Sequence, residues 1–187
     1  MSIHYISPYD AVNKNIGGAI NKSIEQLNIN SSDWIVHIDH DVLFLRPDSK
    51  AQLEHILQTT KYDLLGPLTN RLAQRYQLVP DMFGVTDIRA HVDIANGLHT
   101  SHYGQTQSTP NVLAAFCLCF RKSVWDACRF RESSLQFDSQ FSIAAKRAGF
   151  RAAIMTGLYV FHAYRLWSTN PRQDIRHLQM LPERHRL

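Results

Sequence analysis

The chain has 187 residues, of which 44% are hydrophobic and 19% charged, and its formal net charge is +4 with the histidines neutral. This length supports one domain with a substantial core, and we predict a single domain over residues 1–187 with a basic tail over about 165–187. No run approaches about eighteen apolar residues, and the N-terminus lacks a charged segment followed by an apolar one. These features argue against a transmembrane segment and a secretion signal, so we expect a cytoplasmic protein.

The start of the chain predicts a strand and then an amphipathic helix. The strand covers residues 3–7 and leads into the turn Ser7-Pro8-Tyr9-Asp10, because proline cannot continue a central ladder. The helix covers residues 15–27, where apolar residues recur at helical spacing after Gly17 and Gly18. Glycines at a helix start let an anion approach the backbone amides. Asn21 lies one turn further on, where a packing or solvent role is the alternative to a functional one.

The strand from Trp34 to Ile38 carries the strongest functional signal. Two carboxylates, Asp39 and Asp41, follow its β-branched and aromatic run. Acids this close at the end of a buried strand repel each other unless a cation lies beside them. A hard divalent metal prefers such oxygen ligands, so the pattern indicates a metal site. A strand that simply ends in a polar turn is the alternative.

The rest of the chain continues the alternation of strands and helices. Asn70 and Arg71 follow one predicted strand, at the kind of sheet edge where ligands bind. Asp138 stands at the start of a later helix, where it can also be a cap. The predicted elements are a helix over 48–59, a strand over 62–66 ended by Gly66-Pro67, a short helix near 85–94, a polar loop over 97–110, a strand over 112–120, short helices near 121–128 and 137–148, and two strands over 152–156 and 158–161 separated by Gly157.

This alternation predicts an α/β fold with a mostly parallel central sheet flanked by helices. In such a sheet the carboxyl ends of the strands gather at one edge, and ligands bind there. We therefore expect the residues at these ends to share one site. They are Tyr9, Asp39, Asp41, Arg71 and His162.

Six segments in order resemble the glycosyltransferase family 2 enzymes, which have the Rossmann-like glycosyltransferase A fold. Each match is weak alone, and their order and spacing together carry the resemblance. The short connection after the first segment is similar to a compact member of that family, and a phenylalanine stands where the family has a glutamate. The segments are Ser7-Pro8-Tyr9-Asp10, Gly17 to Asn21, Asp39-His40-Asp41, Ala114 to Trp125, Phe137-Asp138 and Gly157 to His162.

The resemblance implies an inverting transferase that moves a sugar from a nucleoside-diphosphate sugar, by family default a UDP sugar, to an acceptor hydroxyl. Asp39, Asp41 and His162 would hold Mn²⁺, or Mg²⁺ in its place, and Asp138 would deprotonate the acceptor. The donor nucleotide would contact Ser7, Pro8, Tyr9, Asp10, Gly17, Asn21 and His40. Further substrate or phosphate contacts would come from Asn70, Arg71, Tyr164 and Arg165.

Two other functional classes fit the same residues. A metal-dependent phosphohydrolase or nucleotidyltransferase would also use a dense set of ligands such as His37, Asp39, His40 and Asp41. Against it, His37 and His40 point to opposite faces of the strand and cannot both bind one ion. The other class is a nucleotide-sugar-binding module without turnover.

The acceptor is predicted only as a class. The resemblance implies a glycan or a lipid-linked acceptor, which are the commonest acceptors in the family. Clustered basic residues contact phosphates, so the arginines of the tail are also compatible with a nucleic acid acceptor. A solvated basic terminus is the alternative explanation of the same residues.

Overall fold

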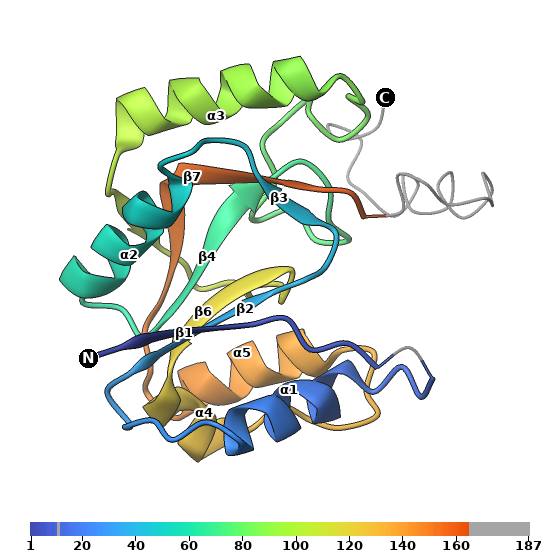
Figure 1. Cartoon of the computed structure of the whole chain (residues 1–187), viewed down its shortest axis with the longest axis vertical. Coiled ribbons are helices and arrows are strands. Elements are labelled where there is room, and N and C mark those ends of the chain that lie inside the picture. Colours follow the sequence, from blue (N-terminus) through green and yellow to red (C-terminus); the bar gives the residue numbers. More distant parts are fainter. Residues whose placement is uncertain (11, 165–187) are drawn as a thin grey trace.

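The computed structural model describes residues 1–10 and 12–164 (Figure 1). In this part of the chain, one mixed sheet of seven strands is flanked by five helices. None of these helices combines the length and the apolar content needed to span a bilayer. Arg165 and the rest of the predicted basic tail lie outside the described residues.

The sheet has the order β1-β2-β6-β4-β7-β3, and β5 pairs with β7 beside this path. Its strands are β1 (Ile3–Ile6), β2 (Trp34–Ile38), β3 (Val42–Phe44), β4 (Leu64–Thr69), β5 (Thr106–Ser108), β6 (Cys117–Arg121) and β7 (Ala152–His162). The helices are α1 (Ile16–Glu25), α2 (Ser49–Thr59), α3 (Ile88–His102), α4 (Lys122–Cys128) and α5 (Phe137–Arg147).

The expectation of a mostly parallel sheet is wrong. β1 pairs with β2 and β4 pairs with β7 in parallel, whereas the other four pairings are antiparallel. Apolar periodicity identifies a strand but contains no information about its direction. Because β6 runs antiparallel to both β2 and β4, the strands β1, β2, β4 and β7 still point the same way. Their carboxyl ends therefore lie at one edge.

Alternation along the strands divides the core between the two faces of the sheet. Ile35 of β2 packs with Ile20 of α1 and Phe141 of α5, while its neighbour Val36 packs with Leu53 of α2. Helices α1, α4 and α5 accordingly cover one face, and α2 covers the other with α3 beside it (Figure 1). Because alternate side chains pack on opposite faces of the sheet, the register of β2 is fixed, and with it the place where the strand ends.

Strand β4 continues through the proline at which we expected it to end. Its register with β7 shifts between Pro67 and Leu68, and such an irregularity is where a strand tolerates a residue without an N–H group. Gln77 packs over Gly66 and donates from Nε2 to the carbonyl oxygen of Pro67 at 3.0 Å. A side chain at position 66 would meet this amide, so the glycine has a packing role inside the strand.

Other predicted elements also differ from the structure. Helix α3 extends to His102 and residues 106–108 form β5, so the polar loop expected over 97–110 is mostly regular structure. The strand expected over 112–120 begins only at Cys117, and β3 was not expected. The two last strands are one strand, β7, in which Gly157 allows the end of α3 to approach: a Cβ there would overlap the carbonyl oxygen of His102.

We predict that Gly157→Ala destabilises the fold by about 1–3 kcal/mol, because the added methyl group must displace backbone rather than a flexible side chain. Urea unfolding followed by circular dichroism measures this change. Gly97→Ala is the matched control, since a Cβ at that position of α3 meets no atom within 4 Å. It should stabilise the helix by up to about 1 kcal/mol. Equal effects of the two substitutions would contradict the packing role of Gly157.

Candidate metal centre

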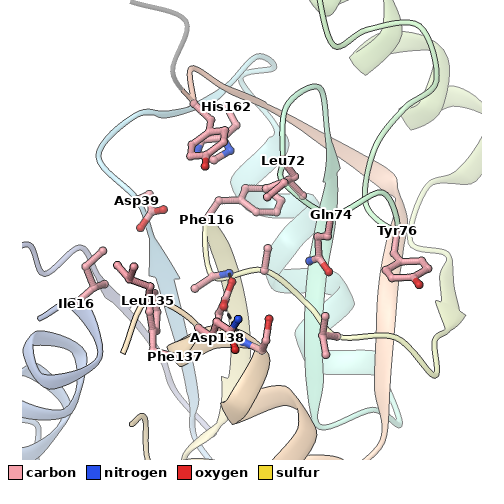
Figure 2. A pocket seen from close by; sticks show the side chains of 17 residues that line it. Ile16, Asp39, Leu72, Gln74, Tyr76, Phe116, Leu135, Phe137, Asp138 and His162 are labelled. Atoms are coloured by element: carbon pink, nitrogen blue, oxygen red, sulfur yellow. Dashed lines mark hydrogen bonds between the residues drawn. The ribbon is translucent and has the colours of Figure 1, made fainter. Parts of the chain in front are cut away.

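The carboxyl ends of β2 and β7 border a cavity of about 460 Å³ (Figure 2). Asp39, which directly follows β2, and His162, the last residue of β7, lie on one part of its wall. Asp138, from the first turn of α5, lies on another part, across the cavity from His162 (Figure 2). The sheet edge therefore gathers an imidazole and two carboxyl groups around one cavity.

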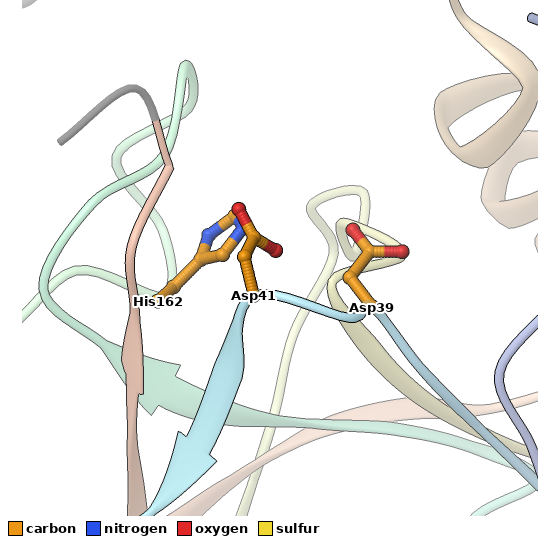
Figure 3. A group of neighbouring side chains, drawn as sticks. All are labelled: Asp39, Asp41 and His162. Carbon is orange, nitrogen blue, oxygen red and sulfur yellow. The ribbon is translucent and has the colours of Figure 1, made fainter. Parts of the chain in front are cut away.

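Backbone pairing brings Asp41 to the same place. The N–H of Val42 donates to the carbonyl oxygen of Asp39 at 3.2 Å, and this turn leads into β3, in which Val42 pairs with His162 of β7. The N–H of Ala163 then donates to the carbonyl oxygen of Asp41 at 2.9 Å. One ligand atom each of Asp39, Asp41 and His162 lies within 4.8 Å of the others (Figure 3). The three residues form a possible metal centre.

The hydrogen bonds of His162 determine which ring nitrogen carries the hydrogen. Nδ1 lies 2.8 Å from the carbonyl oxygen of Arg71, which can only accept, so Nδ1 must donate. In the neutral ring, Nε2 then has a lone pair, and it faces Oδ1 of Asp41 at 3.3 Å. Two atoms with lone pairs at this distance need a proton or a metal cation between them. The donor set therefore fits a cation.

The ring of His162 is also fixed by packing. It is only 4% exposed, and both Phe116 and Tyr164 stack against it, with ring centroids 5.2 and 5.4 Å away. The backbone N–H of His162 donates to Oδ1 of Asn70 at 2.8 Å. With its ring and its backbone both restrained, the imidazole cannot rotate away from the two acids without breaking these contacts.

The two acids differ in their surroundings. Burial raises the pKa of the Asp41 carboxyl, but when the ring of His162 is protonated its hydrogen bond and its charge outweigh burial, so that this pKa lies below its usual value. Asp39 is partly exposed and contacts the buried ring of His37, whose Nε2 lies 3.1 Å from Oδ1. Asp41 therefore offers a carboxylate oxygen to a cation at neutral pH, and the Asp39 side chain lies beside it.

Asp138 has the environment of a carboxyl group that holds its proton more tightly than usual. Its Oδ1 accepts the N–H of Ser139 at 2.6 Å, and Oδ2 accepts the N–H of Ala115 at 3.4 Å. Burial raises the pKa of Asp138 above its usual value, although these two hydrogen bonds oppose the shift. A half-buried acid that lines a cavity with a raised pKa is suited to take a proton from a bound group.

The expected nucleotide site lies beside the two acids. Ser7 and Pro8 lead from β1 to Tyr9, whose exposed ring lies against the ring of His40, with centroids 4.8 Å apart. Asp10 uses Oδ1 to accept the N–H groups of residues 12 and 13, and these bonds lower the pKa of its carboxyl. Tyr9 and Asp10 also border a hollow of about 740 Å³ against α1.

Gly17 and Asn21, which we expected to contact the donor nucleotide, both have packing roles. A Cβ at Gly17 would overlap the carbonyl oxygen of Arg131, so the glycine lets α1 approach that loop. The side-chain amide of Asn21 makes three hydrogen bonds inside the protein: Nδ2 donates to the carbonyl oxygen of Phe130, and Oδ1 accepts from the indole of Trp125 and from the N–H of Phe130. Both residues are buried.

Asn70 and Arg71 restrain His162 by hydrogen bonds. Asn70 is fully buried and holds the backbone of His162, while the carbonyl oxygen of Arg71 orients its ring. The guanidinium of Arg71 stacks on Phe83, 4.8 Å from the ring centroid. Neither residue lines the cavity, whereas Tyr164 does.

Phe116 also lines the cavity, and the sequence did not indicate this. An aromatic residue inside an apolar run is normally interpreted as part of the core.

Comparisons with known proteins do not assign the chain to a family. No known protein family matches it, and no curated protein matches it. The function is therefore inferred from the side chains around the cavity.

We predict that Mn²⁺ raises the melting temperature of the wild type, because an ion that binds only the folded chain stabilises it by about 2.7 kcal/mol at about a hundredfold excess over its Kd. Asp41→Asn and His162→Ala should abolish most of this increase, since each removes a ligand. Asp93→Asn, which changes an exposed acid on α3, is the control. An equal response to Mn²⁺ in all four proteins would show that the ion binds elsewhere.

Proposed function

We propose that the chain is a metal-dependent, inverting glycosyltransferase that resembles family 2 and has a compact glycosyltransferase A fold. Its donor would be a nucleoside-diphosphate sugar, with UDP the expected nucleotide. The observation that carries the proposal is that one cavity is lined by two members of a candidate cation-binding set, Asp39 and His162, and on a different part of its wall by a carboxyl group of raised pKa, Asp138. Asp41, the third member of the set, has a carboxylate oxygen within 4.8 Å of the other two ligand atoms.

The leaving group of such a donor explains the need for the acids and the imidazole. The diphosphate of the donor carries negative charge and gains more when its bond to the sugar breaks, and a bound Mn²⁺ or Mg²⁺ would supply Lewis-acid neutralisation of that charge. Asp39 and Asp41 would hold the ion through carboxylate oxygens and His162 through Nε2, whose lone pair is already directed at Asp41. The mixed oxygen and nitrogen set favours Mn²⁺.

Asp138 would act on the acceptor. A carboxylate with a raised pKa takes the proton of the attacking hydroxyl more readily at neutral pH, which contributes about 10²–10⁴-fold to the rate. Asp138 lies across the cavity from His162, so a hydroxyl that donates to it would approach the sugar from the side opposite the diphosphate. Attack from that side inverts the configuration at the anomeric carbon.

The rings of Tyr9 and His40 are suited to hold the nucleotide base. His40 lies between the two acids along the chain, and Tyr9, whose ring lies against it, is 62% exposed, so one face is available for stacking. Ser7, Pro8 and Asp10 would border the base and the ribose, and Tyr164 would reach the diphosphate. A glycan or a lipid-linked acceptor is proposed for the remaining part of the cavity, with a nucleic acid as the alternative.

A phosphohydrolase or nucleotidyltransferase is less well supported because the histidines next to the acids lie apart. His37 is fully buried behind Asp39, while His40 lies against Tyr9. Products separate the classes when sugar nucleotides are incubated with the protein and Mn²⁺. Slow release of nucleoside diphosphate supports the transferase, release of nucleoside monophosphate or phosphate supports the hydrolase, and binding without release supports the module without turnover.

We predict that Asp138→Asn lowers turnover of the sugar nucleotide by about 10²–10⁴-fold, because the amide cannot accept a proton. Binding of nucleoside diphosphate with Mn²⁺ should stay close to wild type, since Asp138 is not a ligand in the proposed metal site. Calorimetry measures this binding, and the rate at which nucleoside diphosphate is released from the sugar nucleotide measures the turnover. Asp93→Asn is the control. Full activity in Asp138→Asn would remove this residue from the mechanism.

Asp138→Asn should also change the stability of the fold in a pH-dependent way. Because the pKa of Asp138 is higher in the folded than in the unfolded chain, the folded wild type binds more protons between these two values, and its stability falls as the pH rises through that window. Asparagine does not titrate, so the stability of the variant relative to wild type should increase as the pH rises through that window and stay constant above it. Urea unfolding in EDTA at several pH values measures the difference, and a pH-independent difference would contradict the raised pKa.

A further inference from the structure

His37 is a buried histidine in an otherwise apolar strand. It is fully buried within β2, and its neighbours along the strand are Val36 and Ile38. Its Nε2 lies 3.1 Å from Oδ1 of Asp39, two residues later and on the same face of the extended backbone. Its Nδ1 is buried and has no hydrogen-bond partner among the described residues.

These contacts determine the tautomer of the neutral ring. A carboxylate can only accept, so the nitrogen that faces Asp39 carries the hydrogen and Nδ1 has the lone pair. His162 has the opposite arrangement, because its Nδ1 donates to a carbonyl oxygen and its Nε2 lone pair faces an acid. One histidine is therefore built to offer a lone pair to a cation, and the other to donate a hydrogen bond to a ligand of that cation.

The position of His37 also has a cost for the fold. Nδ1 leaves a polar atom in the core without a partner, and a leucine or phenylalanine would fill the same space without that loss. Among the described residues, Asp39 is the only one that forms a hydrogen bond with the ring of His37. This hydrogen bond is therefore the contribution that a histidine makes here and an apolar residue could not. That contribution lies at the candidate metal centre, outside the core.

We propose that His37 is a positioning residue for Asp39. Donation from Nε2 holds Oδ1 in place and leaves Oδ2 for the cation shared with Asp41 and His162. Without this bond, the partly exposed Asp39 side chain can rotate toward solvent, and the ion loses a preorganised ligand. The proposal rests on the metal centre of the proposed function but not on sugar transfer.

Two substitutions separate the hydrogen bond from the volume of the ring. His37→Phe keeps an aromatic ring in the core and removes the donor, whereas His37→Gln keeps an N–H donor near the position of Nε2. Loss of such a supporting hydrogen bond typically weakens metal binding by about 10- to 100-fold. We expect His37→Phe to raise the Kd for Mn²⁺ by this factor and His37→Gln to stay close to wild type. Paramagnetic resonance of unbound Mn²⁺ measures the Kd, and melting in EDTA reports the fold.

The outcomes are distinct. Weaker Mn²⁺ binding in His37→Phe, with rescue by His37→Gln and wild-type melting in EDTA, supports the proposal. Wild-type affinity in His37→Phe overturns it while the metal centre stands, and equal loss in both variants overturns it because the donor then does not matter. A wild type that binds no Mn²⁺ removes the metal centre and this proposal together.

The tautomer of His37 gives a second test that does not require the variants to fold. Nitrogen-15 correlation spectra of the metal-free wild type distinguish a hydrogen on Nε2 from one on Nδ1. The proposal requires Nε2–H at His37, and Nδ1–H at this residue overturns it. His162, expected as Nδ1–H in its neutral form, is the internal reference.

Discussion

The candidate site depends on one hydrogen bond, from Nδ1 of His162 to the carbonyl oxygen of Arg71. This bond places the hydrogen on the nitrogen that faces the protein and the lone pair on the nitrogen that faces Asp41. The ring then has a defined chemical role, because a lone pair directed at a carboxylate attracts a cation. Phe116 and Tyr164 keep the ring in this orientation by stacking against it.

Much of the fold and of the site could be predicted from sequence, because both follow from local patterns. The run from Trp34 to Ile38 gave β2 its observed bounds, and the acids after it lie at the expected sheet edge. Strand directions could not be predicted, because periodicity is the same in either direction. The packing roles of Gly17 and Asn21 also depend on a loop more than a hundred residues away, so no local pattern contains them.

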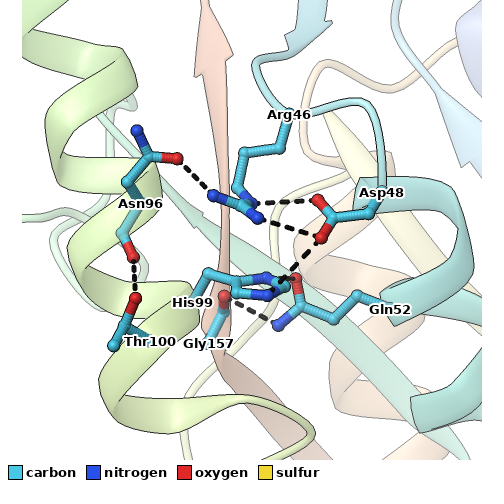
Figure 4. A network of polar contacts seen from close by, with 7 residues as sticks. All are labelled: Arg46, Asp48, Gln52, Asn96, His99, Thr100 and Gly157. Atoms are coloured by element: carbon cyan, nitrogen blue, oxygen red, sulfur yellow. Dashed lines mark hydrogen bonds and ion pairs between the residues drawn. The ribbon is translucent and has the colours of Figure 1, made fainter.

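Helix α3 shows the same limit. We expected it to end near residue 94, since its second half has few apolar residues, but it extends to His102. Long-range polar contacts hold that half: Arg46 donates to Asn96 and to both carboxylate oxygens of Asp48, next to the start of α2 (Figure 4). Helical propensity alone does not reveal such support, because its partners come from a distant part of the chain.

Strand β3 has three residues, Val42–Phe44, and lies at the edge of the sheet with β7 as its partner. So short an edge strand has few backbone bonds with which to resist fraying. Asp41 lies just before β3 and His162 at the end of β7. An ion bound by both residues would therefore stabilise the pairing of the two strands. By thermodynamic reciprocity, if the ion stabilises this pairing by some factor, the paired strands bind the ion more tightly than the frayed strands by the same factor. The extent to which β3 frays should therefore depend on whether the metal centre holds an ion.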